Sequence, residues 1–242
     1  EVTSLESEAL DQIKSAIGDS GDDIAAIIIE PIQGEGGDNH FRKEFLRNLK
    51  TVCQENEIML IFDEVQTGLG ITGKMWAWEH FDVVPDLMSF GKKTQVCGFV
   101  SGSRLDEVGN NVFRESSRIN STWGGNLTDM VRTTIYLEII REENILEKVA
   151  ASGAHLLDKL RTLQEDYPDL VSNVRGLGLM CAFDLPTGEM RDSATRAVLE
   201  NGAFILGCGN HSIRFRPPLN ISRHEIDLGI QIVRRALDSI RT

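Results

Sequence analysis

Two continuously apolar runs, each followed directly by an acidic residue, most restrict how this chain can fold. The runs occupy residues 25–29 and 58–62, and the acids that follow them are Glu30 and Asp63. Apolar residues recur at helical spacing over residues 41–53, so a helix is expected there. A strand, a helix and a second apolar strand predict an α/β fold with a mainly parallel sheet buried on both faces.

The acids after the two predicted strands indicate where a ligand would bind. In open parallel sheets, ligands lie beyond the carboxyl ends of the strands. Four acids follow these strand ends, namely Glu30, Glu35, Asp63 and Glu64. We therefore expect their side chains to face one crevice at that edge of the sheet.

The rest of the chain predicts further elements and a second domain. Short strands are expected at 87–90 and 96–101, and long helices at 126–141 and 145–163. Short strands follow at 171–174, 180–185 and 212–216, with residues 191–199 between them and a closing helix at 222–240. Ser222 and Glu225 have the spacing of a capping box for that helix. We expect part of a large domain, with helices flanking its sheet, over residues 1–141 and a small C-terminal α+β domain over residues 142–242.

Composition excludes several classes of partner. The chain has 25 Lys and Arg residues against 37 Asp and Glu residues, a formal net charge of −12. Such a charge repels nucleic acid and anionic membrane surfaces. No apolar stretch approaches the about 18 residues of a transmembrane helix, and residues 1–11 are unlike a signal peptide. The four cysteines and five histidines show no zinc-ligand spacing, so we expect a soluble, cytoplasmic protein without a metal.

Lys92 is the first candidate for chemistry, because residues 87–91 would carry it to a strand end near Asp63. Pyridoxal 5'-phosphate (PLP) requires a lysine that bonds to its aldehyde and a carboxylate that keeps its pyridine nitrogen protonated. Burial, or a like charge on Lys93, would lower the pKa of the Lys92 amine as that reaction demands. The alternative is that both lysines are solvated. Asp63 favours the PLP site, because an acid at the end of a buried strand needs a cationic partner.

A dinucleotide site is a competing interpretation. Residues 68–73 read G-x-G-x-x-G shortly after a predicted strand, which is typical of a phosphate-binding turn. However, five residues separate the strand from the first glycine, and two of them, Asp63 and Glu64, would repel a pyrophosphate. Pro85 also leaves room only for a short helix afterwards. A second glycine-rich candidate, at 176–181, precedes a strand-like segment instead of a helix.

Two further segments carry polar groups that could bind a ligand. Residues 120–126 gather hydroxyls, amides and glycines just ahead of a predicted helix, so they could bind phosphate or serve as an ordinary helix cap. Arg214 and Arg216 lie on one face of a predicted strand. An arginine there could bind a substrate carboxylate or be a surface group.

Together these segments resemble the class III aminotransferases of fold type I, and within that family the branch that transfers the ε-amino group of L-lysine. The matching segments cover almost the whole chain and are residues 30–37, 62–68, 90–98, 120–129 and 214–219. The first two are shared by the class. The lysine-bearing segment and residues 120–126 are narrower, and they point to the lysine branch over the ornithine or 4-aminobutyrate branches.

The resemblance implies roles for individual cofactor-site residues. Lys92 would bond to PLP and carry a proton during catalysis, while Asp63 would pair with the pyridine nitrogen. Gln66 would contact the ring hydroxyl. Thr122 would reach the phosphate of the other subunit's cofactor, which implies a homodimer with shared sites.

The resemblance also implies how the substrates bind. Arg214 would hold the α-carboxylate of 2-oxoglutarate, and Glu35 would neutralise Arg214 when L-lysine presents its ε-amine. An unpaired buried guanidinium would otherwise cost several kcal/mol. Asn120 is a further expected substrate contact.

The expected activity is transfer of the ε-amino group of L-lysine to 2-oxoglutarate, giving 2-aminoadipate 6-semialdehyde and L-glutamate. Ornithine or 4-aminobutyrate as donor is the alternative. The family's subunit has a long N-terminal part with further cofactor contacts that these 242 residues lack. We therefore expect the chain to be a C-terminal portion that needs its complement, or a segment that is inactive by itself.

Overall fold

The computed structural model describes residues 1–119, 122 and 124–241, and within it the chain forms two compact units. The first unit comprises residues 1–31, 41–66 and 77–136. The second comprises residues 32–40, 67–76 and 137–242. Helix α4 (Leu127–Glu142) contributes residues to both. Two short stretches from early in the sequence therefore belong with the C-terminal part of the chain.

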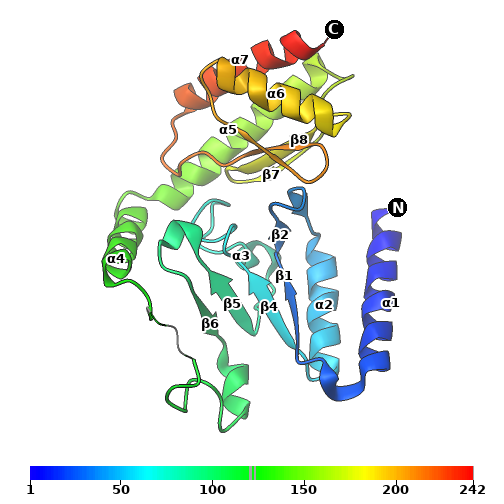
Figure 1. The fold of residues 1–242 in the computed structure, drawn as a ribbon, viewed down its shortest axis with the longest axis vertical. Coiled ribbons are helices and arrows are strands. Elements are labelled where there is room, and N and C mark those ends of the chain that lie inside the picture. The colour runs from blue at the N-terminus through cyan, green and yellow to red at the C-terminus, as the bar shows by residue number, and fades with distance from the viewer. Residues whose placement is uncertain (120–121, 123, 242) are drawn as a thin grey trace. The chain divides into compact units, whose positions relative to one another are not determined.

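The first unit is built on a four-stranded sheet in the order β1-β4-β5-β6 (Figure 1). Its strands are β1 (Ala26–Ile29), β4 (Met59–Asp63), β5 (Leu87–Phe90) and β6 (Gly98–Ser101). The first three run parallel and β6 is antiparallel to β5. This confirms the predicted mainly parallel sheet and its four strands to within two residues at each end.

Helices cover part of this sheet. Helix α2 (Lys43–Glu55) packs on β4, and α1 (Val2–Ser20) packs on α2. The shorter helices of the unit are α3 (Trp78–Phe81), η1 (Gly21–Asp23), η2 (Lys92–Thr94) and η3 (Ser103–Glu107). Leu60 and Phe62 on the central strand β4 are fully buried, but Ile28 on the edge strand β1 is exposed. Leu60 and Phe62 share one face of β4, whereas Met59 and Ile61 on the other face are only half-buried, and Ile28 is the residue of β1 that pairs with Ile61. The prediction that the sheet is buried on both faces is therefore right for one face and wrong for the other, as far as the described residues cover it.

The second unit contains an antiparallel sheet in the order β7-β8-β10-β9. Its strands are β7 (Ser172–Leu177), β8 (Met180–Asp184), β9 (Leu206–Cys208) and β10 (Ser212–Phe215). Helix α5 (Ile145–Asp166) packs on β7 and β8, α6 (Gly188–Glu200) packs on β9 and β10, and α7 (Arg223–Ile240) contacts both helices. The predicted capping box of Ser222 and Glu225 is present at the start of α7. A two-stranded hairpin of β2 (Ile32–Gln33) and β3 (Asn39–His40) completes the unit.

Glycines allow backbone segments of the second unit to approach one another closely. A Cβ atom on Gly153 of α5 would lie 2.2 Å from the backbone carbon of Gly178, and one on Gly178 would lie 2.4 Å from that of Thr72. Gly70 and Gly73 of the glycine-rich segment likewise pack near side chains of α5. Close packing thus accounts for the last two glycines of the G-x-G-x-x-G pattern, and the helix that follows it, α3, has four residues. None of the helices described here is long and apolar enough to span a membrane.

We predict that Gly153→Ala destabilises the protein by about 2–4 kcal/mol, because the added methyl group would overlap backbone atoms that cannot rotate away. Gly229→Ala, in α7, is the matched control. A Cβ atom there meets nothing within 4 Å, so it should stabilise the protein by about 0.5–1 kcal/mol. Urea denaturation followed by circular dichroism measures both changes. Equal effects of the two substitutions would contradict the close approach at Gly153.

Candidate functional site

Asp63 ends strand β4 and lies opposite Ser89 of β5 in the strand register. Its Oδ1 accepts a hydrogen bond from the Val65 amide at 3.0 Å. Among the described residues no Lys, Arg or His forms an ion pair with this half-buried carboxylate, and the nearby Ser89 hydroxyl is buried without a hydrogen-bond partner. A carboxylate and a hydroxyl with unused bonding capacity fit a ligand that brings a cationic ring nitrogen, as PLP does.

Lys92 follows β5 and has a backbone conformation that L-residues rarely adopt. Its φ is 52°, and Gln95, three residues later, has φ 62°. Such outliers concentrate at functional sites. The Lys92 amine has no hydrogen-bond or ion-pair partner in the described part of the chain, and the side chain is exposed. The expected burial of Lys92 is therefore not seen within the described residues, since none of them covers its side chain.

The loops after β4 and β5 hold each other in place. The Lys93 amine donates a hydrogen bond to the backbone oxygen of Gln66 at 2.6 Å. A Cβ atom on Gly91 would lie 3.1 Å from the Cys97 sulfur and 3.4 Å from Val65. The interpretation of Lys93 as a solvated surface lysine is wrong, because its amine bonds the neighbouring loop.

Glu64 has a structural role that the sequence did not indicate. It is buried, and its carboxylate accepts hydrogen bonds from the amides of Ala77 at 2.7 Å and Trp78 at 2.9 Å. These amides begin helix α3, whose free N–H groups need acceptors. The prediction that Glu64 faces a ligand crevice is therefore wrong, because both of its oxygens hold backbone.

A second group of predicted residues meets in the second unit. Arg214 lies on β10, between Ala182 of β8 and Leu206 of β9. Its guanidinium forms an ion pair with Glu35 at 2.6 Å, where the Arg214 side chain is 11% exposed and that of Glu35 is 76% exposed. The Nε of Arg214 is buried and has no hydrogen-bond partner. Arg214 is thus a nearly buried cation whose partner is a glutamate that solvent can reach.

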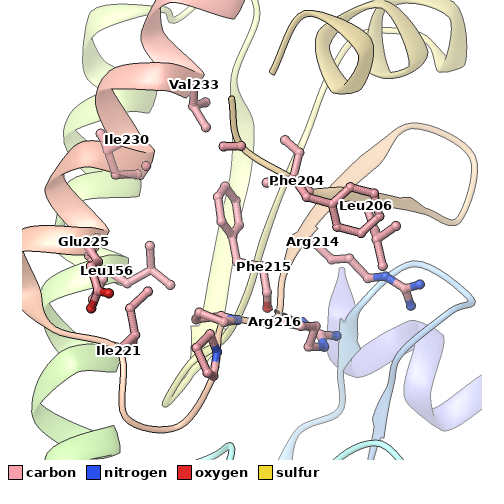
Figure 2. Close-up of a pocket in the computed structure, with 16 residues that line it drawn as sticks. Leu156, Phe204, Leu206, Arg214, Phe215, Arg216, Ile221, Glu225, Ile230 and Val233 are labelled. Atoms are coloured by element: carbon pink, nitrogen blue, oxygen red, sulfur yellow. Dashed lines mark hydrogen bonds between the residues drawn. The ribbon is translucent and has the colours of Figure 1, made fainter. Parts of the chain in front are cut away.

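The opposite face of β10 is apolar. A cavity of about 330 Å³ lies between this strand and helices α5 and α7. Figure 2 shows Phe215 pointing into it with Ile230 and Val233, while the guanidinium groups of Arg214 and Arg216 point away. Alternation along the strand therefore separates an apolar side from a charged one.

The remaining predicted site residues are only partly described. Thr122 is exposed in a bend, and Gln66 is half-buried in the turn that follows β4. Asn120 lies outside the described residues. The structure brings Glu35 and Arg214 into contact, and it places Asp63 and Lys92 after adjacent parallel strands.

One cluster near Glu35 was missed by sequence reasoning. Asp38 is fully buried and pairs with Arg216 through contacts of 2.6 and 3.1 Å. Arg175 donates to the backbone oxygens of Gly37 at 2.6 Å and Asp38 at 2.8 Å. In the sequence, only the presence of two arginines on one face of a predicted strand pointed to this cluster. Their spacing does not indicate which acids they pair with.

Arg175 also joins this cluster to the sheet. Its guanidinium contacts Asp184 at 2.9 Å and Ser212 at 3.0 Å. Burial opposes ionisation of Asp184, but hydrogen bonds from Ser212, Asn173 and Arg175 outweigh it and hold the pKa of that carboxyl below its usual value. Asp184 therefore remains charged at neutral pH.

The chain belongs to the class III aminotransferase family, whose model matches residues 2–237. It is 50% identical over 236 residues to the L-lysine-epsilon aminotransferase of Mycobacterium tuberculosis, covering 98% of this chain and 53% of that protein. A solved structure of lysine aminotransferase from M. tuberculosis superposes with a TM-score of 0.97 at 50% identity, covering 98% of this chain and 55% of that one. The mitochondrial 4-aminobutyrate aminotransferase of Rattus norvegicus is 40% identical over 213 residues, 86% of this chain and 41% of that protein.

The chain thus spans about half the length of the curated relatives it matches. The match to the fold of solved aminotransferases confirms the predicted fold type I architecture.

We predict that His40 makes stability depend on pH between about 6.5 and 4. Burial is the main cause that lowers the pKa of His40 to about 4; Asp38 opposes it, and Arg175 and Arg216 add to it. As pH falls through this range, the unfolded chain binds a proton that folded His40 does not, so stability is lost. His40→Gln should remove roughly 1–3 kcal/mol of that loss.

Urea denaturation at pH 7, 5.5 and 4 measures this dependence. The exposed His224 provides the control, because His224→Gln should leave the pH dependence as in the wild type. The interpretation fails if His40→Gln and His224→Gln change the pH dependence equally.

Proposed function

We propose that this chain is part of a PLP-dependent aminotransferase that transfers the ε-amino group of L-lysine to 2-oxoglutarate. The products are 2-aminoadipate 6-semialdehyde and L-glutamate. The single observation that most supports the proposal is the Arg214–Glu35 ion pair. The choice of L-lysine as donor rests on the likeness to proteins named for that substrate.

The ion pair supports an enzyme that binds two unlike substrates in one pocket. 2-Oxoglutarate brings a carboxylate, which the guanidinium of Arg214 binds. Lysine entering with its ε-amine brings an uncharged methylene chain instead, and Glu35 then neutralises Arg214. Because Glu35 is largely exposed while Arg214 is nearly buried, the carboxylate can leave without exposing its own charge to an apolar environment.

PLP, when bound, supplies an aldehyde that reacts with amines and a ring that accepts electrons. In the proposed site, the Lys92 amine would hold the cofactor and would carry a proton to and from the substrate carbon. The Asp63 carboxylate would keep the ring nitrogen protonated, and the side chain of Gln66 would hydrogen-bond the ring hydroxyl. The left-handed backbone at Lys92 and the Lys93 bond to Gln66 support this role, because both fix where the Lys92 side chain begins.

Several further features belong to the proposal. Thr122 binds the phosphate of the cofactor in the partner subunit, so the enzyme is a homodimer with shared sites. Asn120 contacts substrate. The chain works with the additional length that its relatives have, which covers Lys92, and the enzyme is cytoplasmic.

We expect Lys92→Ala in the complete subunit to abolish the visible absorbance of the lysine-bound cofactor and to lower turnover by at least about 10³-fold. Borohydride should remove the same absorbance from the wild type. Lys93→Met is the control, because the Lys93 amine bonds backbone and the absorbance should persist. A wild-type preparation that is colourless with PLP and binds NAD instead would contradict the proposal.

A second candidate donor is 4-aminobutyrate, which the 40% identity to the rat enzyme favours; ornithine is the third compound to compare. A panel of L-lysine, ornithine and 4-aminobutyrate with 2-oxoglutarate, followed by L-glutamate formation, separates them. We predict that kcat/KM for L-lysine exceeds the others by at least about tenfold. Preference for either of the other donors would overturn the assignment of the substrate while leaving the reaction class in place.

A further inference from the structure

Two ion pairs lie next to each other on the charged face of β10. Arg214 and Arg216 are two residues apart, so their side chains leave the strand on the same face. Their partners, Glu35 and Asp38, are three residues apart in the loop between β2 and β3. One loop therefore supplies both acids and one strand segment supplies both arginines.

The two pairs differ in burial and in bonding. Asp38 has no exposed surface, the Arg216 side chain is 16% exposed, and the guanidinium contacts both carboxylate oxygens. The Glu35 carboxylate is mostly exposed and contacts the Arg214 guanidinium at 2.6 Å. A pair in which both charges are buried is costly to open. The exposed Glu35 carboxylate can move into water at little cost to itself, provided that another anion, such as a substrate carboxylate, then pairs with Arg214. The Asp38–Arg216 pair therefore fixes the loop in place, whereas the Glu35–Arg214 pair can form and break.

Other contacts hold the same loop. Arg175 binds the backbone oxygens of Gly37 and Asp38, and the Gly209 amide donates to the backbone oxygen of Glu35 at 2.9 Å. A Cβ atom on Gly209 would lie 2.7 Å from the Cα of Gly37, so the loop rests directly on the β9–β10 turn. Every one of these bonds involves backbone or Asp38, and none involves the Glu35 carboxylate.

We propose that Asp38, held by Arg216 and Arg175, is a positioning residue that keeps the backbone of Glu35 fixed while its side chain joins or leaves Arg214. The inference rests on the proposed function, in which Glu35 alternates between these two states. A fixed backbone keeps the effective concentration of the Glu35 carboxylate near Arg214 high. The loop then need not be ordered anew in each catalytic cycle, so no conformational entropy is lost at that step. The switch is then a side-chain rotation.

The test is Asp38→Asn in the complete enzyme with PLP, with the two half-reactions measured separately. Loosening the loop weakens the Glu35 contact, which the lysine half-reaction needs and the 2-oxoglutarate half-reaction must break. We expect kcat/KM for L-lysine to fall about tenfold, and kcat/KM for 2-oxoglutarate to stay level or rise. Equal losses in both half-reactions overturn the proposal.

A double-mutant cycle with Glu35→Gln shows whether Asp38 acts through Glu35. In the Glu35→Gln background, Asp38→Asn should no longer lower kcat/KM for L-lysine tenfold. Only the small change caused by losing one negative charge should remain. The same tenfold effect in both backgrounds overturns the proposal. If Asp38→Asn does not fold, Arg216→Lys serves instead, because it keeps the charge but loses the two-point contact, and it should change the half-reactions in the same direction.

Binding of glutarate, a dicarboxylate that does not react, gives a measurement without turnover. Calorimetry should show tighter binding by about three- to tenfold in Asp38→Asn, because Glu35 competes less well for Arg214. Asp86→Asn is the matched control: Asp86 is also buried, and it pairs with Lys50 and Arg104 in the first unit. Unchanged glutarate affinity in Asp38→Asn, or an equal gain in Asp86→Asn, overturns the proposal.

These outcomes also separate this inference from the proposed function. If Glu35→Gln alters the two half-reactions differently and Asp38→Asn does not, only the positioning role is wrong. If the wild type does not use L-lysine, the proposed function is wrong and the glutarate measurement decides the positioning role.

Discussion

The fully buried carboxylate of Asp38 is the constraint on which the charged face of the second unit depends. A buried anion is stable only when cations and hydrogen-bond donors surround it, and here Arg216 supplies two donors to it. The Asp38–Arg216 pair fixes the loop that carries Glu35. Arg175 holds the same loop to the sheet, because it binds both the Gly37 backbone oxygen and Asp184 of strand β8. Packing, charge and the presentation of Glu35 to Arg214 thus follow from one buried group.

In the first unit, the sheet itself brings two candidate site residues to the same edge. Parallel strands β4 and β5 end at the same edge, so Asp63 and the segment that carries Lys92 start from neighbouring points. The loops after these strands are joined by the Lys93 bond to Gln66 and by the tight packing of Gly91. An acid and a lysine 29 positions apart in the chain are thereby brought to one edge by backbone geometry alone.

Periodicity in the sequence predicted the strands and long helices well, because buried faces leave a regular apolar pattern. Helix α1 was missed, since only Leu10 and Ile17 are buried along its 19 residues. The Asp38–Arg216 pair joins residues 178 positions apart, and nothing local distinguishes such an aspartate from a solvated one. Glu64 was wrongly predicted to face a ligand for the same reason. It follows a strand end, where a ligand crevice is expected, but the amides of Ala77 and Trp78 that bind it lie more than ten residues further along the chain.

The division of the chain has a consequence for how this molecule is assembled. The backbone passes between the two units after residues 31, 40, 66, 76 and 136, so cutting any single loop cannot release either one as a continuous piece. Asp38, in the loop between β2 and β3, is neutralised by Arg216, which directly follows strand β10. Native pairing over such sequence distances slows folding, because the long intervening segment must first be closed into a loop before the two charges can meet.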